Sequence, residues 1–375
     1  MGPTNFKEKG TPARSVRPVA NWLLLGVVML VFQILLGGIT RLTGSGLSIT
    51  EWKPLLGAIP PLNEADWNAA FQQYQDIAQY KYLNSHFTLS DFKAIYFWEW
   101  LHREWARLMG LVFLVGFGWF LYKKQLTREM VRPFVVLFLL GALQGALGWI
   151  MVVSGLNDTN VYVSHYRLAI HFMAALVLVG YTFWFMLKLR VRETDRIYQP
   201  ALRRNNLLLL GLLTLQLVYG AFMAGLKAAP AAPTWPGING HLFPENIHQY
   251  GNRVFTGLQY LADHPLMVHY IHRSFAFLLC IGMLVFTVRA AGIKNSRKAP
   301  ALGRWYKWPL FLVLMQAVLG ILTVLNAPKA TNSHMGIYEW LAEAHQLVAM
   351  GLMMALLAVL FAVSRKKESG TGLRS

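Results

Sequence analysis

The stretch FWEWLHREWARLMGLVFLVGFGWFLYKK (residues 97–124) decides the class of fold. Its last twenty residues have the length and the apolar character of a helix that crosses a bilayer. Its first eleven residues hold five ionisable groups, Glu99, His102, Arg103, Glu104 and Arg107. Ionisable groups within a membrane span are energetically unfavourable and mark a functional site by default. The stretch therefore predicts a membrane helix that carries a site near one end.

Similar apolar runs recur along the chain. Hydrophobic residues make up 55% of the 375 residues and charged residues only 14%, whereas a soluble domain carries about 25% charged residues. Most of these runs have no polar face, which excludes a soluble helical protein. We therefore predict an all-α integral membrane protein with eight transmembrane helices, at 19–41, 95–122, 133–155, 166–189, 205–226, 265–288, 306–326 and 339–363.

The net charge of +18 is explained by topology. Most Lys and Arg residues fall in the two tails and in the even-numbered connections between the predicted spans. Cytoplasmic connections carry an excess of Lys and Arg, so this pattern places both termini in the cytoplasm. A basic charge distributed in this way indicates membrane orientation, and we expect no nucleic-acid partner.

The two halves of the chain repeat. QILLG (33–37) matches QLVYG (216–220), LHREWARLMG (101–110) matches IHRSFAFLLC (271–280), QGALG (144–148) matches QAVLG (316–320), and IHFMAAL (170–176) matches AHQLVAM (344–350). Each repeat holds an even number of helices, so the halves share one orientation and are related by an axis along the membrane normal. We predict two pseudo-symmetric four-helix bundles, at 19–190 and 205–363, between cytoplasmic tails at 1–18 and 364–375.

Four histidines align across this repeat: His102 with His272, and His171 with His345. Each lies one to two turns inside the outer end of an even-numbered span. Two imidazoles at similar depth in each bundle suit the two faces of a haem. Alternatively, each histidine only hydrogen-bonds between helices. A bare metal centre is less favoured, because no third or fourth ligand aligns with either pair. The Gln-x-x-x-Gly motifs on odd-numbered spans either support close packing or face a cofactor.

The residues around the aligned histidines differ between the halves. Glu99 aligns with His269, while Arg103 aligns with Arg273. Both arginines are candidate partners for haem propionates, or else they contact lipid headgroups. Glu99 is the candidate catalytic residue, and its alternative role is an ion pair with Arg103, four residues further on. This asymmetry predicts a resident cofactor in the second half and the chemistry in the first.

Two outer connections are long, at 42–94 and 227–264. The segment LNEADWNAAFQQYQDIAQY (62–80) predicts a short amphipathic helix at the outer interface. Asn63 is suited to cap it, and Trp67, Phe71, Tyr74 and Ala78 recur at helical spacing. Such a connection either covers a site or anchors the protein at the membrane surface.

Five further stretches stand out: GGITRLTGSGLSITEWKPLLGAIPPL (37–62), EWLHREWARLMG (99–110), VSHYRLAIHF (163–172), HYIHRSFAF (269–277) and EAHQLVAM (343–350). Together they resemble motifs of the haem A synthase family, in its proteobacterial and mitochondrial form. The resemblance covers nearly the whole chain. It implies an oxidoreductase that converts the C8 methyl group of haem O to a formyl group by successive hydroxylations. The product, haem A, serves cytochrome oxidase.

The resemblance also assigns roles to residues of this chain. His272 and His345 are expected to ligate the iron of a resident haem B, and His102 and His171 to hold the iron of the substrate haem O. Glu99 is expected to be the acidic residue needed for turnover. Some members carry a cysteine pair in the first outer loop, but Cys280 is the only cysteine here, so such a pair plays no part.

Physical chemistry agrees with this expectation, because breaking a methyl C–H bond requires a redox cofactor. Two rival functions remain: a bis-histidine di-haem electron-transfer cytochrome, and a haem carrier. A secondary transporter would need broken helices at the midplane. Candidate partners are membrane lipid, haem O synthase, cytochrome oxidase assembly factors and a second copy of the chain. The short N-terminus, without a cleavable signal, favours the bacterial plasma membrane over the mitochondrial inner membrane.

Overall fold

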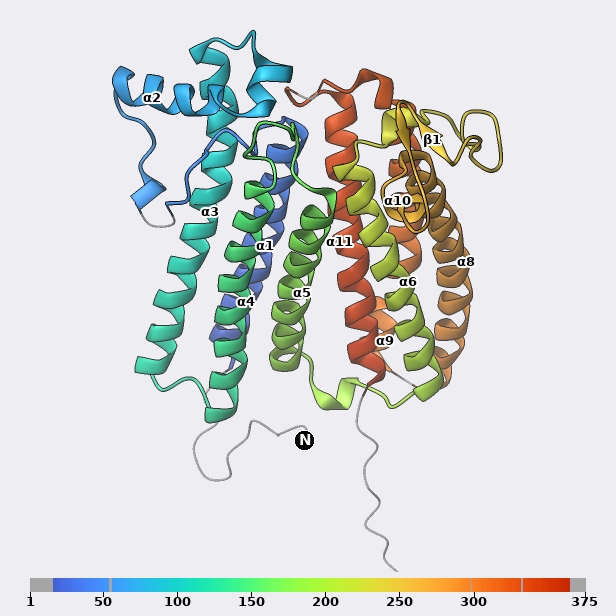
Figure 1. Ribbon diagram of the computed structural model, residues 1–375. Coiled ribbons are helices and arrows are strands. Elements are labelled where there is room, and N and C mark those ends of the chain that lie inside the picture. The colour runs from blue at the N-terminus through green and yellow to red at the C-terminus, as the bar shows by residue number, and fades with distance from the viewer. Residues whose placement is uncertain (1–15, 54–55, 298, 332, 365–375) are drawn as a thin grey trace, which may run out of the picture.

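The computed structural model describes residues 16–364 apart from 54–55, 298 and 332. The predicted tails therefore lie almost wholly outside the described residues. Within them, eight helices are long and apolar enough to cross a membrane (Figure 1). The predicted all-α multi-pass membrane fold is confirmed. These helices are α1 (Arg17–Leu42), α3 (Leu89–Tyr122), α4 (Arg128–Val153), α5 (His165–Arg190), α6 (Pro200–Gly225), α8 (Pro265–Arg297), α10 (Trp308–Leu325) and α11 (Ile337–Val363).

Short elements fill the connections between the long helices. They are η1 (Leu56–Ala58), α2 (Glu64–Gln75), η2 (Tyr80–Asn84), η3 (Glu193–Asp195), η4 (Ala229–Ala231), β1 (Gln249–Tyr250), β2 (Arg253–Val254), α7 (Gln259–Ala262), α9 (Pro300–Trp305) and η5 (Ala327–Lys329). Strands β1 and β2 form a small antiparallel ribbon. Most of these elements lie at one end of the bundle, above α3 and α8 in Figure 1.

Several predicted spans differ from the structure at their ends. Helices α4 and α6 begin five residues before the predicted 133 and 205, and α8 continues to Arg297, beyond the predicted 288. Helix α3 begins at Leu89, before the predicted residue 95, because Thr88 and Asp91 cap it. The Thr88 hydroxyl accepts from the Asp91 amide (3.4 Å), and the Asp91 carboxylate accepts from the Thr88 amide (2.8 Å), which is a capping box. The predicted span 306–326 is preceded by the separate short helix α9, since Tyr306 ends that helix. Hydrophobicity alone did not reveal either boundary.

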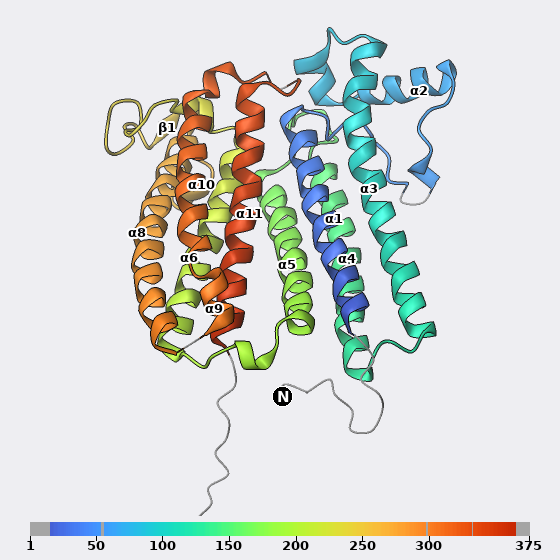
Figure 2. The same ribbon diagram turned by 180° about the vertical axis from the view of Figure 1, so that it is seen from behind.

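The long helices pack in two groups. Helices α1, α3, α4 and α5 contact one another, as do α6, α8, α10 and α11. The groups meet where α1 and α5 contact α11 and where α5 contacts α6 (Figures 1 and 2). The buried core runs through this junction, with Leu176 of α5, Leu213 of α6 and Leu356 of α11 all nearly inaccessible. The domain boundaries and the cytoplasmic side stay predictions.

The first outer connection is anchored to the end of α3. Asn63 caps α2, and its side-chain oxygen accepts from the Asp66 amide at 2.9 Å, so the expected helix is confirmed. Tyr74 of α2 and Phe92 of α3 are fully buried against each other, with ring centroids 5.4 Å apart. This aromatic cluster holds α2 across the outer end of α3, which positions the connection over the first group of helices.

Candidate functional site

Each of the four predicted histidine ligands lies against a glycine of a neighbouring helix. A Cβ atom at Gly37 or Gly148 would lie 3.0 Å from Cε1 of His102 or His171, respectively. The corresponding distances are 3.3 Å for Gly220 and His272, and 3.0 Å for Gly320 and His345. No larger residue fits beside these rings without displacing them. The glycines therefore let each imidazole lie directly on the neighbouring backbone.

A glutamine lies one turn before each of these glycines, on the same helix. We call each pair of glutamine and glycine that faces one histidine a cradle. Gln33 Nε2 lies 3.2 Å from His102 Nδ1 and donates to the His102 carbonyl at 3.1 Å. Gln144 makes the same contacts with His171, at 3.2 and 3.0 Å. In the second half, Gln216 Nε2 lies 3.3 Å from His272 Nε2.

The carboxamide oxygen of each cradle glutamine is buried without a hydrogen-bond partner in the described structure. These oxygens belong to Gln33, Gln144, Gln216 and Gln316. The Nδ1 atoms of His272 and His345 are also buried and have no hydrogen-bond partner among the described residues. Buried polar atoms are normally hydrogen-bonded, and exceptions concentrate at sites that await a ligand or serve a reaction. All four cradles thus hold unsatisfied polar atoms beside an imidazole.

The pairing of cradle and histidine occurs four times, in the helix pairs α1–α3, α4–α5, α6–α8 and α10–α11. The sequence showed the Gln-x-x-x-Gly motifs and the histidines as separate repeats, without showing that each motif faces a histidine. The sequence did hold a signal for this pairing, because every motif lies on the span that precedes one of the four histidines that align across the repeat. The glycines of these motifs pack closely against the candidate ligands, and Gln33, Gln144 and Gln216 contact them. That the glutamines face a cofactor stays a prediction.

The two histidines of the second half face each other. The ring centroids of His272 and His345 are 6.3 Å apart, with an interplanar angle of 68°. Metal–imidazole nitrogen bonds are about 2 Å long, so two imidazoles on opposite sides of one iron have centroids about 6 Å apart. The separation, together with the unsatisfied Nδ1 atoms, fits axial ligation of a haem iron.

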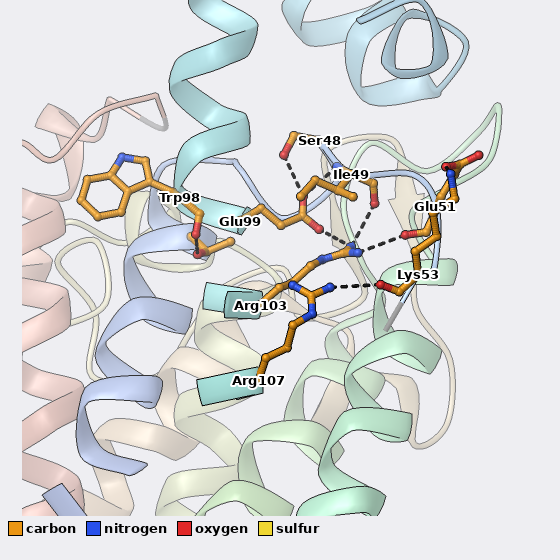
Figure 3. Close-up of polar contacts among 9 residues, drawn as sticks. Ser48, Ile49, Glu51, Lys53, Trp98, Glu99, Arg103 and Arg107 are labelled. Atoms are coloured by element: carbon orange, nitrogen blue, oxygen red, sulfur yellow. Dashed lines mark hydrogen bonds and ion pairs between the residues drawn. The ribbon is translucent and has the colours of Figure 1, made fainter. Parts of the chain in front are cut away.

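The Glu99 carboxylate is hydrogen-bonded to the first outer connection (Figure 3). Its carboxylate accepts from Ser48 Oγ at 2.7 Å and from the Ile49 amide at 2.9 Å, and it pairs with Arg103 at 2.6 Å. Only 2% of Glu99 is exposed. The ion pair with Arg103 is therefore present, and the carboxylate also ties residues 48–49 to α3. His269, the aligned residue, is also buried, but its Nδ1 has no hydrogen-bond partner in the described part of the chain.

The two aligned arginines hold the outer connections in place. Arg103 donates to the carbonyls of Ile49 (2.9 Å) and Glu51 (3.0 Å), as Figure 3 shows. Arg273 donates to the carbonyls of Gly237 (2.9 Å) and Ala232 (3.0 Å). Sequence reasoning missed this shared role. A role of either arginine toward a propionate stays a prediction.

The chain matches the COX15-CtaA family model, described as cytochrome oxidase assembly protein, over residues 20–357. It belongs to this family. Similar members include proteins named heme A synthase from Rhizorhabdus wittichii, 42% identical over 92% of this chain and 94% of that protein, and from Rhodopseudomonas palustris strain BisB5, 39% identical over 95% and 94%. A third, from Sphingopyxis alaskensis, is 36% identical over 97% and 98%.

Membership of the COX15-CtaA family confirms the resemblance found in the motifs. The matched region runs from α1 into α11 and includes all four histidine cradles and Glu99. The assignment of individual residues to a haem or to catalysis does not follow from membership alone.

Proposed function

We propose that this protein is a haem A synthase, which oxidises the C8 methyl group of haem O to a formyl group. The observation that carries the proposal is the set of four histidines cradled by Gln and Gly, two in each half, in a chain whose relatives named heme A synthase match it over nearly its full length. Its product would serve the cytochrome oxidase whose assembly the family is named for.

In the second half, His272 and His345 would hold a resident haem B. Their facing rings and unsatisfied Nδ1 atoms support this assignment. When bound, haem supplies the one-electron redox chemistry that side chains lack. Gln216 and Gln316 would orient the two imidazoles, as outer partners of metal-ligating histidines generally do.

In the first half, His102 and His171 would hold the substrate haem O, and Gly37 and Gly148 would set the position of their rings. Glu99 would take up a proton released during oxidation, since a positioned carboxylate is a suitable general base. Its contacts with Ser48, Ile49 and Arg103 hold the oxygen atoms in place and keep the first outer connection against α3.

The test is product formation in membranes. Cells that lack their own haem A synthase would express this chain together with haem O synthase, and extracted haems would be separated and identified by mass. Haem A is expected with the parent chain and with His86→Ala, an exposed histidine outside the cradles, but not with His345→Ala. Membranes that contain only haem B and haem O with the parent chain would refute the proposal.

One observation favours a second function: the distances between glycine and histidine are similar in all four cradles. A bis-histidine di-haem cytochrome that only transfers electrons would need two equivalent haem sites, and it would not require the buried Glu99 of the first half. Such a protein would hold two haem B molecules and form no haem A in the same experiment.

We further propose that the protein works in the bacterial plasma membrane, as its proteobacterial relatives suggest. Haem O is insoluble in water, so direct transfer from haem O synthase would suit the substrate. Cytochrome oxidase assembly factors and a second copy of this chain are the other proposed partners.

A further inference from the structure

A short segment of the first outer connection runs along α3, next to His102. We call residues 49–53 the strap. Every second carbonyl oxygen of the strap accepts a hydrogen bond from an arginine of α3 (Figure 3). Arg103 donates to the first two, at 2.9 and 3.0 Å, and Arg107 donates to the third at 3.0 Å. The three accepting carbonyls are those of Ile49, Glu51 and Lys53.

The strap also contacts α4. The ring of Trp52 lies against the ring of Trp149, with centroids 5.3 Å apart. Trp149 directly follows Gly148 of the His171 cradle, just as Arg103 directly follows the other candidate ligand of the first half. The strap therefore connects α3 and α4 at positions that adjoin both histidine sites of the first half.

The strap has one buried end and one exposed end. The Ser48 hydroxyl and the Ile49 amide donate to the Glu99 carboxylate, and both Ser48 and Glu99 are only 2% exposed. Residues 51–53 are exposed. Exposed hydrogen bonds contribute little net free energy, because water can replace them, and segments with few buried contacts open most easily. The exposed end can thus leave α3 while the buried end stays attached.

The attachments of the strap through Arg107 and Trp149 do not recur among the described residues of the second half. Phe277 aligns with Arg107, and Ile321 aligns with Trp149. Phe277 stacks instead on Trp235 of the second outer connection, with centroids 5.6 Å apart and an interplanar angle of 22°. Water can replace a hydrogen bond to a carbonyl but not an apolar contact. The second connection is therefore attached to its helix more permanently than the strap is.

We propose that the strap is a movable lid of the first half, which detaches from α3 and α4 to let the substrate haem enter and the product leave. This inference rests on the proposed function, in which only the first half exchanges its haem in every turnover. Arg107 and Trp52 are positioning residues, which hold the closed strap beside the two histidine sites. The sequence left open whether the first outer connection covers a site or anchors the protein, and the lid is a covering role.

The test measures how fast each haem leaves the full-length chain. The parent and the variants would be co-expressed with haem O synthase, purified, and mixed with an excess of apomyoglobin, which captures released haem. The haems that remain on the chain would be extracted over time and identified by mass. Haem B and farnesylated haem are then followed separately in the same sample.

Two strap variants are compared with two matched controls. Arg107→Gln removes the hydrogen bond to the Lys53 carbonyl, and Trp52→Ala removes the contact with α4. Glu104→Gln is the control for Arg107→Gln, because it breaks the Glu104–Arg107 ion pair and leaves the donor to the strap in place. Trp119→Ala is the control for Trp52→Ala, because Trp119 is similarly exposed (55% against 49%) and lies near the opposite end of α3.

A hydrogen bond from a charged group, or an aromatic contact, contributes about tenfold to an equilibrium constant. We therefore expect farnesylated haem to leave Arg107→Gln and Trp52→Ala about tenfold faster than it leaves the parent and the two controls. Haem B should leave all five proteins at the same rate, which also shows that the variants are folded.

Two results would overturn the inference and leave the proposed function intact. One is release of farnesylated haem at the parental rate from both strap variants. The other is an equal acceleration of haem B release, which would mean that the variants loosen the whole protein.

A parent chain that holds two haem B molecules and no farnesylated haem would contradict the proposed function. The lid would then stand if the strap variants accelerated the release of one haem B and not the other, and it would fail if they accelerated both or neither. A parent chain that binds no haem would refute both the inference and the proposed function.

Discussion

Glu99 and the cradle residues show how single side chains define the site. A buried carboxylate with three donors, Ser48, Ile49 and Arg103, is held in one orientation. The sequence identified Glu99, His102 and Arg103 as unusual, because ionisable residues stand out in an apolar span. It did not identify Gln33 or Gln144 as partners of histidines, because the facing helix is chosen by tertiary packing and leaves no trace in the periodicity of either helix.

The charge of Glu99 is testable separately from its role in holding the connection. Glu99→Gln keeps the shape of the side chain but removes the proton acceptor. We expect it to retain bound haem and to lower haem A output on the order of a hundredfold, the effect of losing a general base. Haem O or a hydroxylated intermediate should accumulate, as measured by chromatography and mass.

Ser48→Ala is the matched control for Glu99→Gln, since it removes one hydrogen bond from the carboxylate and keeps the charge. It should lower haem A output far less. Equal losses in the two variants would mean that attachment of the outer connection, and not proton transfer, explains the importance of Glu99.

Gly148 tests whether the cradles position the histidines. A Cβ there would lie 3.0 Å from His171 Cε1, whereas a Cβ at Gly141, two turns earlier on α4, would meet nothing within 4 Å. Gly148→Val should displace the imidazole and remove the haem of the first half, while Gly141→Val should leave it bound. The measurement is haem content per chain, by absorbance after purification. Equal loss of haem in both variants would contradict the claim that Gly148 positions His171.

At the scale of elements, the apolar spans were predictable and their polar ends were not. Helix α3 extends to Leu89 because of the capping box of Thr88 and Asp91, a local hydrogen-bond pattern that hydropathy does not detect. Helix α2 was predictable, because Asn63 and the aromatic spacing are both local signals. Its docking on α3 through Tyr74 and Phe92 depends on residues far apart in the fold and was not predicted in detail.

Docking of α2 should depend on pH. Burial raises the pKa of Tyr74 from its usual value of 10 to about 12. A raised pKa means that the neutral phenol stabilises the folded connection at every pH below 10, and that this stabilisation is lost as the pH rises from 10 toward 12.

Hydrogen exchange or limited proteolysis of residues 63–92 should therefore show opening between pH 10 and 12. Tyr74→Phe cannot ionise and should remove this transition. A transition of the same midpoint and size in Tyr74→Phe would assign it to another group.

At the scale of the whole molecule, the repeat predicted two histidine pairs, and the structure adds the contact that joins the two groups of helices. Gln346 of α11 donates to the Ile34 carbonyl of α1 at 3.3 Å, and Glu343 lies directly against Gly38. The junction thus lies between the cradle of His102 and the helix that carries His345. A sequence repeat indicates that the two halves have similar structures, but it does not predict which residues form the interface between them.

The most direct test of the account is to identify the haems bound by the purified chain, co-expressed with haem O synthase, in His272→Ala and in His102→Ala. If the two histidine pairs form two different sites, each variant should lose a different haem. His272→Ala should lose haem B and keep haem O or haem A, and His102→Ala should keep haem B and lose the farnesylated haem. If the parent holds only haem B, or if both variants lose the same haem, the central claim of one cofactor site and one substrate site is contradicted.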